Sequence, residues 1–193
     1  MKISIFFHIK TPFFYSNIDF FILKMYHIYI VLQSKFSKEN STFMTRKEKA
    51  MQSFLEGYNC SQCMMIAFED LLTIDLDTAL KISSSFGGGM GRLREVCGSV
   101  SGMFMVLGFI YGYSTPGNHD EKKQLYAHIQ ELGRRYEEAN GSIICRELLG
   151  LNVQHDTPTP ADRTPEYYAN RPCAAKIGSA AEILEAYLLE LAQ

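Results

Sequence analysis

The stretch Phe86-Gly-Gly-Gly-Met-Gly-Arg-Leu-Arg-Glu-Val-Cys97-Gly-Ser-Val-Ser-Gly102 decides how this chain folds. Because glycine adopts positive φ without strain, the run Gly87–Gly91 predicts the end of one helix and a tight bend. The segment from about Val96 to Tyr113 is nearly all apolar or small. It predicts a central buried helix whose apolar core is too short to span a membrane. The bend therefore delivers Cys97 to the start of that helix.

The same stretch also has a functional interpretation. Backbone N–H groups of a glycine-rich bend, together with a guanidinium, are suited to holding an anion or the edge of a cofactor. Gly98 and Gly102 remove side chains from one helix face, against which another helix packs or a flat cofactor lies. Because the run matches neither a Walker loop nor a dinucleotide fingerprint, nucleotide binding is not expected. The candidate cofactor-binding residues are Gly87, Gly88, Gly89, Gly91, Arg92 (with Arg94 as its alternative), Gly98 and Gly102.

Residues 1–43 differ in composition from the rest of the chain. They contain no Gly and no Ala, whereas all 14 glycines lie beyond them. They are rich in residues whose codons can be built from A and T alone, which is typical of translated noncoding DNA. A targeting segment or membrane anchor is the alternative, but the apolar runs Ile3–Phe7 and Ile18–Leu32 are too short. We expect residues 1–43 to be an irregular, non-native extension, and Met44 to be the initiator.

Residues 44–193 have the length of one ordinary domain. They contain 14 basic and 19 acidic residues with no basic stripe, so nucleic acid is not an expected partner. All five cysteines lie in this part of the chain. An odd count without a secretory signal does not indicate a structural disulfide framework, so we expect a reducing cytoplasm. Grouped cysteines in that compartment bind metal or do redox work more often than they form structural bridges.

Capping signals and apolar periodicity predict helices throughout this domain. A further helix is expected from about Asp75 to Phe86, a short one between Ser142 and Gly150, and a last one from Pro172. Residues 151–172 hold four of the six prolines and predict a loop over the surface. No segment alternates as a strand should, so the predicted class is all-α, a single compact multi-helix domain. Three pairs of residues predict helix N-termini: Thr45 with Glu48, Asn59 with Gln62, and Asn118 with Glu121.

Four cysteines fall at the expected helix starts: Cys60, Cys97, Cys145 and Cys173. Cys145 is expected at the third position after a Ser142 cap. Free N–H groups and the positive partial charge of a helix N-terminus stabilise a thiolate over a thiol. The thiolate is both the reactive nucleophile and the metal-ligating form. This placement favours redox or metal chemistry over the alternative, in which the cysteines are small buried apolar residues.

Cys60 and Cys63 form a CxxC pair on one helical face. A thioredoxin-type dithiol has this spacing, but it follows a strand in a βαβ unit, which this sequence lacks. Cys63 is therefore an accessory thiol at most, or a core residue.

The segment Cys97-Gly-Ser-Val-Ser-Gly102 resembles the CGAxxG element of the C_GCAxxG_C_C family, whose members are described as redox-active proteins. Gly-Tyr-Asn-Cys60-Ser-Gln, Phe-Gly-Gly-Gly-Met-Gly-Arg, Cys145-Arg-Glu-Leu-Leu-Gly and Cys173 fit its other elements in order. The resemblance covers about residues 45–190. It implies that the family's four characteristic cysteines are Cys60, Cys97, Cys145 and Cys173. Ser99 stands where the element has Ala, and Cys63 is an addition.

Three hypotheses follow. In the first, the four cysteines hold an iron–sulfur cluster or another thiophilic metal, and the protein transfers electrons or senses redox state. In the second, they form exchangeable disulfides in a thiol–disulfide oxidoreductase. In the third, the chain is a non-catalytic helical module with buried cysteines. The sequence names no redox partner protein and predicts no membrane partner. A homodimer is expected if the Gly98/Gly102 face packs between subunits, but packing within the chain explains that face equally well.

Overall fold

The computed structural model describes residues 44–193, and these are all helical apart from turns and loops. The prediction of an all-α class is confirmed for this part of the chain, in which no strand occurs. The expectation about residues 1–43 lies outside the described residues. The elements are α2 (Arg46–Leu55), α3 (Cys60–Ala67), the 3-10 turn η1 (Glu69–Leu71), α4 (Leu76–Ser84), α5 (Gly87–Met90), α6 (Gly98–Tyr111), α7 (His119–Asn140), α8 (Cys145–Leu148), α9 (Pro165–Ala169) and α10 (Cys173–Leu191).

The predicted helix starts form as the capping rules require. Thr45 and Asn59 each make a complete capping box, in which the cap side chain accepts an N–H and the Glu or Gln three residues later reaches back. Asp75 and Asn118 accept N–H groups at the starts of α4 and α7. Local side chains therefore fix where these helices begin.

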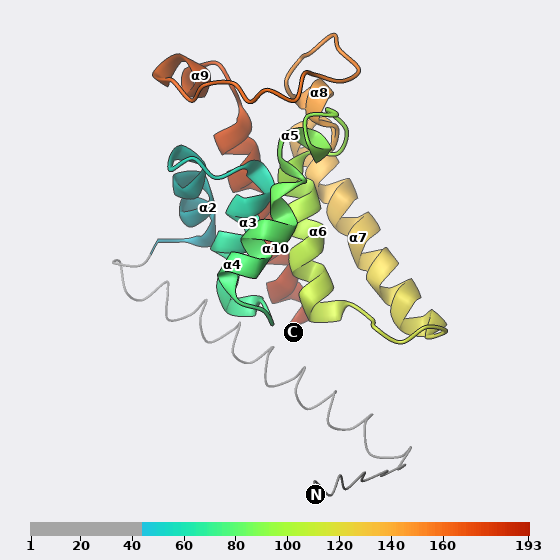
Figure 1. Cartoon of the computed structure of the whole chain (residues 1–193). Coiled ribbons are helices and arrows are strands. Elements are labelled where there is room, and N and C mark those ends of the chain that lie inside the picture. The colour runs from blue at the N-terminus through green and yellow to red at the C-terminus, as the bar shows by residue number, and fades with distance from the viewer. Residues whose placement is uncertain (1–43) are drawn as a thin grey trace, which may run out of the picture. The chain divides into compact units, whose positions relative to one another are not determined.

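Helix α6 is the central element of the bundle (Figure 1). Its first six residues and Val106 and Leu107 are buried, and α3 and α7 pack against it. Gly98 and Gly102 make the α3 contact close. A Cβ added at Gly98 would lie 3.0 Å from the Cβ of Cys60, and one at Gly102 would lie 2.7 Å from the Cβ of Met64. The glycine face that suggested a homodimer or a flat cofactor is thus covered by a helix of the same chain.

The first part of α10 lies between α2 and α7. Its Gly178 faces Met51 of α2, where an added Cβ would lie 2.7 Å from the sulfur. Towards α7, Asn140 donates to the Ser179 hydroxyl at 2.9 Å and Tyr136 donates to the Lys176 carbonyl at 3.4 Å. These contacts fix the start of α10, which carries Cys173, relative to the rest of the bundle.

Two sequence predictions need correction. Residues 151–172 are not entirely loop, because Thr164 caps the short helix α9 and Pro165 occupies its first turn. Ser142 does not cap a helix that begins beside it, because the N-cap of α8 is Ile144. The Ser142 hydroxyl instead accepts the Ile144 N–H at 2.9 Å and donates to Glu147. Cys145 therefore stands at the first position of α8, not the third.

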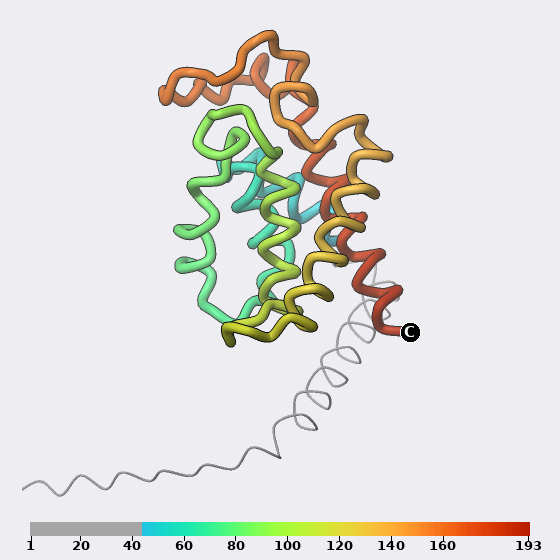
Figure 2. Tube along the Cα trace, turned by 90° about the vertical axis from the view of Figure 1, so that its right-hand side faces the viewer, coloured from blue at the N-terminus to red at the C-terminus, as the bar shows by residue number. Residues whose placement is uncertain are grey.

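The ends of the helices that carry the cysteines meet at one end of the bundle. In Figures 1 and 2 this end holds α5, α8 and α9, and the loop from residue 151 to 172 crosses it. Residues 44–187 belong to one compact unit, and every residue of the site below lies within it. Among the described residues, no helix combines the length and the apolar character needed to cross a membrane.

Candidate functional site

The glycine run forms a left-handed bend. Gly88, Gly89 and Gly91 have φ of 66°, 72° and 62°, as predicted for a tight turn. Met90, Arg92 and Arg94 also have positive φ, which costs on the order of 1 kcal/mol or more for a residue with a side chain. Such strain persists only where surrounding contacts enforce it. Here the bend aims two guanidinium groups at the loop after α8.

The contacts that hold the two arginines of the bend come largely from the carboxylate of Asp156. Asp156 accepts from both Arg92 and Arg94 at 2.7 Å. Arg92 also donates to the Thr157 carbonyl at 2.5 Å. The Arg94 hydrogen bond is the main reason that the pKa of the Asp156 carboxyl is lowered to about 2. The pair of arginines is therefore held by a carboxylate that stays ionised throughout the neutral range.

Past the bend, the segment before Cys97 pairs with the segment before α8. Val96 and Ile144 form an isolated antiparallel bridge. The Cys97 N–H donates to the Ile143 carbonyl at 2.8 Å, and the Cys145 N–H donates to the Glu95 carbonyl at 2.6 Å. A Cβ at Gly89 would lie 2.6 Å from the Cβ of Cys145, so only glycine permits this approach. The pairing brings two cysteines 48 positions apart in sequence to the same place.

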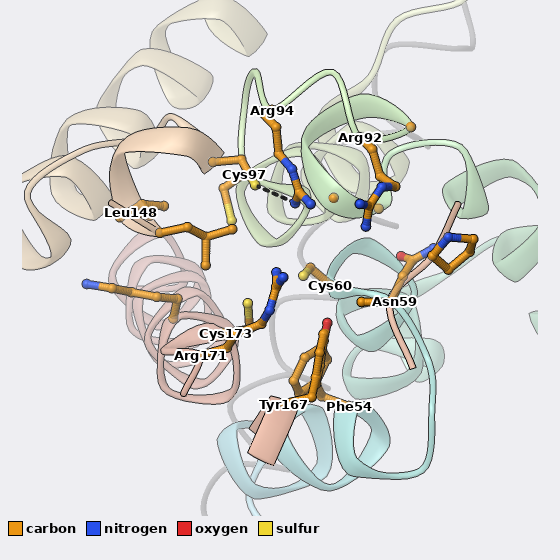
Figure 3. Close-up of a pocket in the computed structure, with 18 of the residues that line it drawn as sticks. Phe54, Asn59, Cys60, Arg92, Arg94, Cys97, Leu148, Tyr167, Arg171 and Cys173 are labelled. Atoms are coloured by element: carbon orange, nitrogen blue, oxygen red, sulfur yellow. Dashed lines mark hydrogen bonds between the residues drawn. The ribbon is translucent and has the colours of Figure 1, made fainter. Parts of the chain in front are cut away.

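The four cysteines of the family pattern, Cys60, Cys97, Cys145 and Cys173, line a single cavity of about 300 Å³. Each stands at a helix start: Cys60, Cys145 and Cys173 are the first residues of α3, α8 and α10, and Cys97 is the N-cap of α6. Figure 3 shows the sulfurs of Cys60, Cys97 and Cys173 facing a common space. All five cysteines of the chain are free thiols. The structure therefore brings the four predicted cysteines to one location.

Cys60 and Cys173 influence each other's ionisation. Side-chain hydrogen bonding with Cys60 is the main reason that the pKa of Cys173 is lowered to about 7, with Arg171, Arg94 and Arg163 adding to the effect against the cost of burial. The influence of Cys173, with burial, raises the pKa of Cys60 well above its usual value. Cys173 is therefore the more readily ionised thiol of the two.

Cys97 and Cys145 occupy the more enclosed side of the cavity, with 7% and 6% of their surfaces exposed. Burial raises the pKa of Cys145, and the neighbouring Cys97 raises it further, although Arg94 opposes both by donating to the Cys145 sulfur at 3.8 Å. The Cys97 sulfur lies 3.2 Å from the Ser99 hydroxyl, which in turn lies 3.3 Å from that of Tyr136. Polar neighbours therefore hold these two thiols in place.

Cys63 lies apart from the cavity. It is fully buried in α3, and its thiol donates to the Tyr58 carbonyl at 3.8 Å. Burial raises its pKa to about 12. The alternative that Cys63 is a core residue fits this location better than an accessory role.

Basic side chains surround the thiols. Five cations line the cavity, and no carboxylate does: Arg92, Arg94, Arg163, Arg171 and Lys176. Arg171 lies over the ring of Tyr167 at 4.7 Å, and Figure 3 shows both side chains beside Cys173. Sequence reasoning found Arg92 and Arg94 but missed the cations that follow residue 151. The one signal in the sequence that could have indicated a cation near the thiols was Arg171, which precedes Cys173 by two positions.

The candidate cofactor-binding glycines divide into two groups. Gly87, Gly88, Gly91 and Arg92 line the cavity. Gly89, Gly98 and Gly102 do not, because they are the places where Cys145, Cys60 and Met64 approach the backbone.

The arrangement was also tested against the metal hypothesis. Within residues 44–193, no group of three or more His, Cys, Asp or Glu side chains has the spacing of a metal site. All four thiols of the cavity are free.

Comparison with known proteins gives one match. The model of the family described as "Putative redox-active protein (C_GCAxxG_C_C)" matches residues 58–187. That range contains all five cysteines, the glycine bend and every residue that lines the cavity except Phe54. Neither a curated protein nor a solved structure matches the chain.

Proposed function

Since this chain belongs to the C_GCAxxG_C_C family of redox-active proteins, we propose that it is a thiol–disulfide oxidoreductase in which Cys173 is the nucleophile and Cys60 the resolving thiol. The observation that carries the proposal is that both thiols line one cavity, in which Cys60 is the main cause of a pKa of Cys173 lowered to about 7. A nucleophilic thiolate beside a protonated thiol is the arrangement that disulfide exchange needs.

The reaction with a disulfide substrate has two steps. The Cys173 thiolate attacks one sulfur of the substrate, which forms a mixed disulfide and expels the other half as a thiolate. Cys60 then gives up its proton and attacks the Cys173 sulfur. This forms a Cys60–Cys173 disulfide, releases the second half of the substrate as a thiolate, and supplies one proton to a leaving thiolate. The substrate disulfide is reduced by two electrons, and the two cysteines are oxidised. The reverse sequence oxidises a dithiol.

Cys97 and Cys145 are proposed to exchange with the first pair. They share its cavity, and Cys97 contributes to the raised pKa of Cys60. A Cys97–Cys145 dithiol could take over the disulfide from Cys60 and Cys173 and return them to the reduced state. An external dithiol would then complete the cycle.

A second candidate is a thiolate-bound metal centre used for electron transfer or redox sensing. One observation favours it, namely that four thiols at four helix starts line the same cavity. Metal binding assembles ligands that are spaced too widely without it. Anaerobic purification with iron, sulfide and zinc analysis tests this candidate. Stoichiometric metal that is lost in Cys97→Ser and Cys173→Ser alike would favour it over exchange.

The test of disulfide exchange is a linkage map. The reduced protein is treated with one equivalent of bis(2-hydroxyethyl) disulfide, quenched with acid, alkylated and digested for mass spectrometry. We expect a Cys60–Cys173 disulfide as the first product, and a Cys173 mixed disulfide that persists in Cys60→Ser. First reaction at Cys63, or no loss of thiols at all, would contradict the proposal.

A further inference from the structure

We infer that the cavity takes a small anionic disulfide, one whose two halves carry carboxylate or sulfonate groups, as the substrate of the Cys60–Cys173 pair. This inference rests on the proposed function and specifies its substrate class. It depends on the charge, the unsatisfied donors and the size of the cavity, which are independent of the sulfur chemistry.

The charge balance of the cavity favours an anion. The guanidinium and ammonium groups of five residues line it, and among its lining residues there is no Asp or Glu. The nearby carboxylate of Asp156 is shared between Arg92 and Arg94. Lys176 donates to the Asn140 carbonyl, and Arg163 donates to the carbonyls of Phe54 and Tyr58, so neither is neutralised by these bonds. The net positive charge of this cavity contrasts with the acidic excess of the chain as a whole.

Two of the cations, Arg94 and Arg171, have N–H groups that can bind a ligand. Arg94 is only 2% exposed, yet its Nε–H has no hydrogen-bond partner among the described residues. A buried donor without an acceptor destabilises the folded protein, and an anionic ligand would supply the missing acceptor. Arg171 has an aromatic contact with Tyr167 but no ion pair with any described carboxylate. Figure 3 places Arg94 and Arg171 around the same space as the Cys173 sulfur.

The size of the cavity limits the occupant. A volume of about 300 Å³ fits a small molecule and excludes a folded partner. The rings of Phe54 and Tyr167 and four residues of the proline-rich loop, Pro158, Pro160, Ala161 and Pro172, give the walls an apolar part. That part suits the methylene and sulfur atoms of a disulfide, while the arginines suit its charged ends.

The chemical step is the exchange described above. The Cys173 thiolate attacks the S–S bond, one carboxylate-bearing half leaves as a thiolate, and Cys60 releases the other half. The arginines take no part in bond changes. They hold the two anionic ends so that the S–S bond lies in line with the Cys173 sulfur.

The test compares three disulfides of similar length and different charge: 3,3′-dithiodipropionate (anionic), bis(2-hydroxyethyl) disulfide (neutral) and cystamine (cationic). We expect the second-order rate with the full-length reduced protein to be roughly tenfold or more higher for the anionic than for the neutral compound, and lowest for the cationic one. The preference should shrink as salt is added. Equal rates for the anionic and neutral compounds would overturn this inference and leave the proposed function standing.

A non-reactive analogue separates the two proposals. 3,3′-Thiodipropionate has the same charges but a thioether in place of the disulfide. We expect it to slow alkylation of Cys173 by neutral iodoacetamide, and bis(2-hydroxyethyl) sulfide not to do so. If no disulfide reacts at Cys173 but the analogue still protects it, the proposed function fails and the anion site survives. No protection at any concentration would refute the anion site.

The matched variants are Arg171→Gln and Arg134→Gln. Arg134 is exposed on α7, does not line the cavity, and pairs with Glu131 and Glu138. Because loss of Arg171 also weakens the Cys173 thiolate, the readout is the ratio of anionic to neutral rates, in which that effect cancels. We expect the ratio to fall several-fold in Arg171→Gln and to stay unchanged in Arg134→Gln. An unchanged ratio in Arg171→Gln would contradict the role of Arg171.

Discussion

The cavity has two sides, one with Cys60 and Cys173 and the other with Cys97 and Cys145. Both sides place thiols at helix starts, but the pKa values of these thiols differ. Cys173 and Cys145 are both the first residues of helices, yet the pKa of Cys173 is lowered to about 7 whereas that of Cys145 is raised. The pKa of Cys173 is lowered by Cys60 and by three arginines. Cys145 has Arg94 alone, which does not offset the effects of burial and of the neighbouring Cys97 on its pKa. A helix start therefore prepares a thiol for reaction only when neighbouring donors and charges agree with it.

The largest expected effect comes from removing one thiol from each side of the cavity and comparing the two reaction rates. We expect Cys173→Ser to slow reaction with a neutral disulfide at pH 7 by about 100-fold, because burial raises the pKa values of Cys63 and Cys145 and Cys97 is enclosed. Cys145→Ser should lower the initial rate by less than about twofold, because it leaves the Cys60–Cys173 pair intact. Stopped-flow thiol loss with mass mapping measures both. Equal losses would show that the two sides react as one.

The second test removes the hydrogen bond that distinguishes Cys173. In the unaltered protein, alkylation of Cys173 should fall about tenfold for each pH unit below its midpoint near 7, because only the thiolate reacts. In Cys60→Ala the midpoint should rise toward the usual thiol value of about 8.5, since the bond that favours the charged form is gone. The measurement is the pH dependence of iodoacetamide labelling. A midpoint that stays near 7 would assign the lowered pKa to the arginines instead.

The smallest expected effect comes at the glycine that joins the two sides. Gly98→Ala would place a methyl group 2.9 Å from the Phe86 carbonyl and 3.0 Å from the Cys60 Cβ, so α3 and α6 must separate. We expect a loss of about 1–3 kcal/mol in unfolding free energy.

The matched control is Gly108→Ala, which lies in the same helix with no atom within 4 Å. It should be neutral or stabilising by about 0.5–1 kcal/mol, because alanine favours a helix interior. Thermal or urea unfolding measures both variants. Similar stabilities would mean that the α3–α6 contact is not close enough to need glycine.

Local signals in the sequence account for most of the fold. The capping boxes at Thr45 and Asn59 and the apolar run of α6 lie where composition and spacing indicate. The prediction failed where a longer-range contact replaced a local one. Ser142 looks like a helix cap, but its hydroxyl bonds to Glu147 while the Val96–Ile144 bridge sets the start of α8. Such a bridge depends on two segments that no local pattern connects.

The candidate site divides in the same manner. The four cysteines at helix starts, the bend and its arginines were evident from spacing, because helix caps and glycine conformations are local properties. Two roles could not be deduced from the sequence. One is Asp156, which binds Arg92 and Arg94 from more than sixty positions away. The other is the pairing of Cys60 with Cys173 across the length of the domain.

The sequence by itself determined that residues 44–193 form helices and that Cys60, Cys97, Cys145 and Cys173 begin four of them. Tertiary structure alone decided which cysteines are partners, which one has a lowered pKa, and how many cations surround them. The physical reason is that a helix start depends on neighbours along the chain, whereas a pKa depends on whichever groups lie close in space. The stretch Phe86–Gly102 connects the two levels, because its glycines permit the close approaches that bring distant thiols into one cavity.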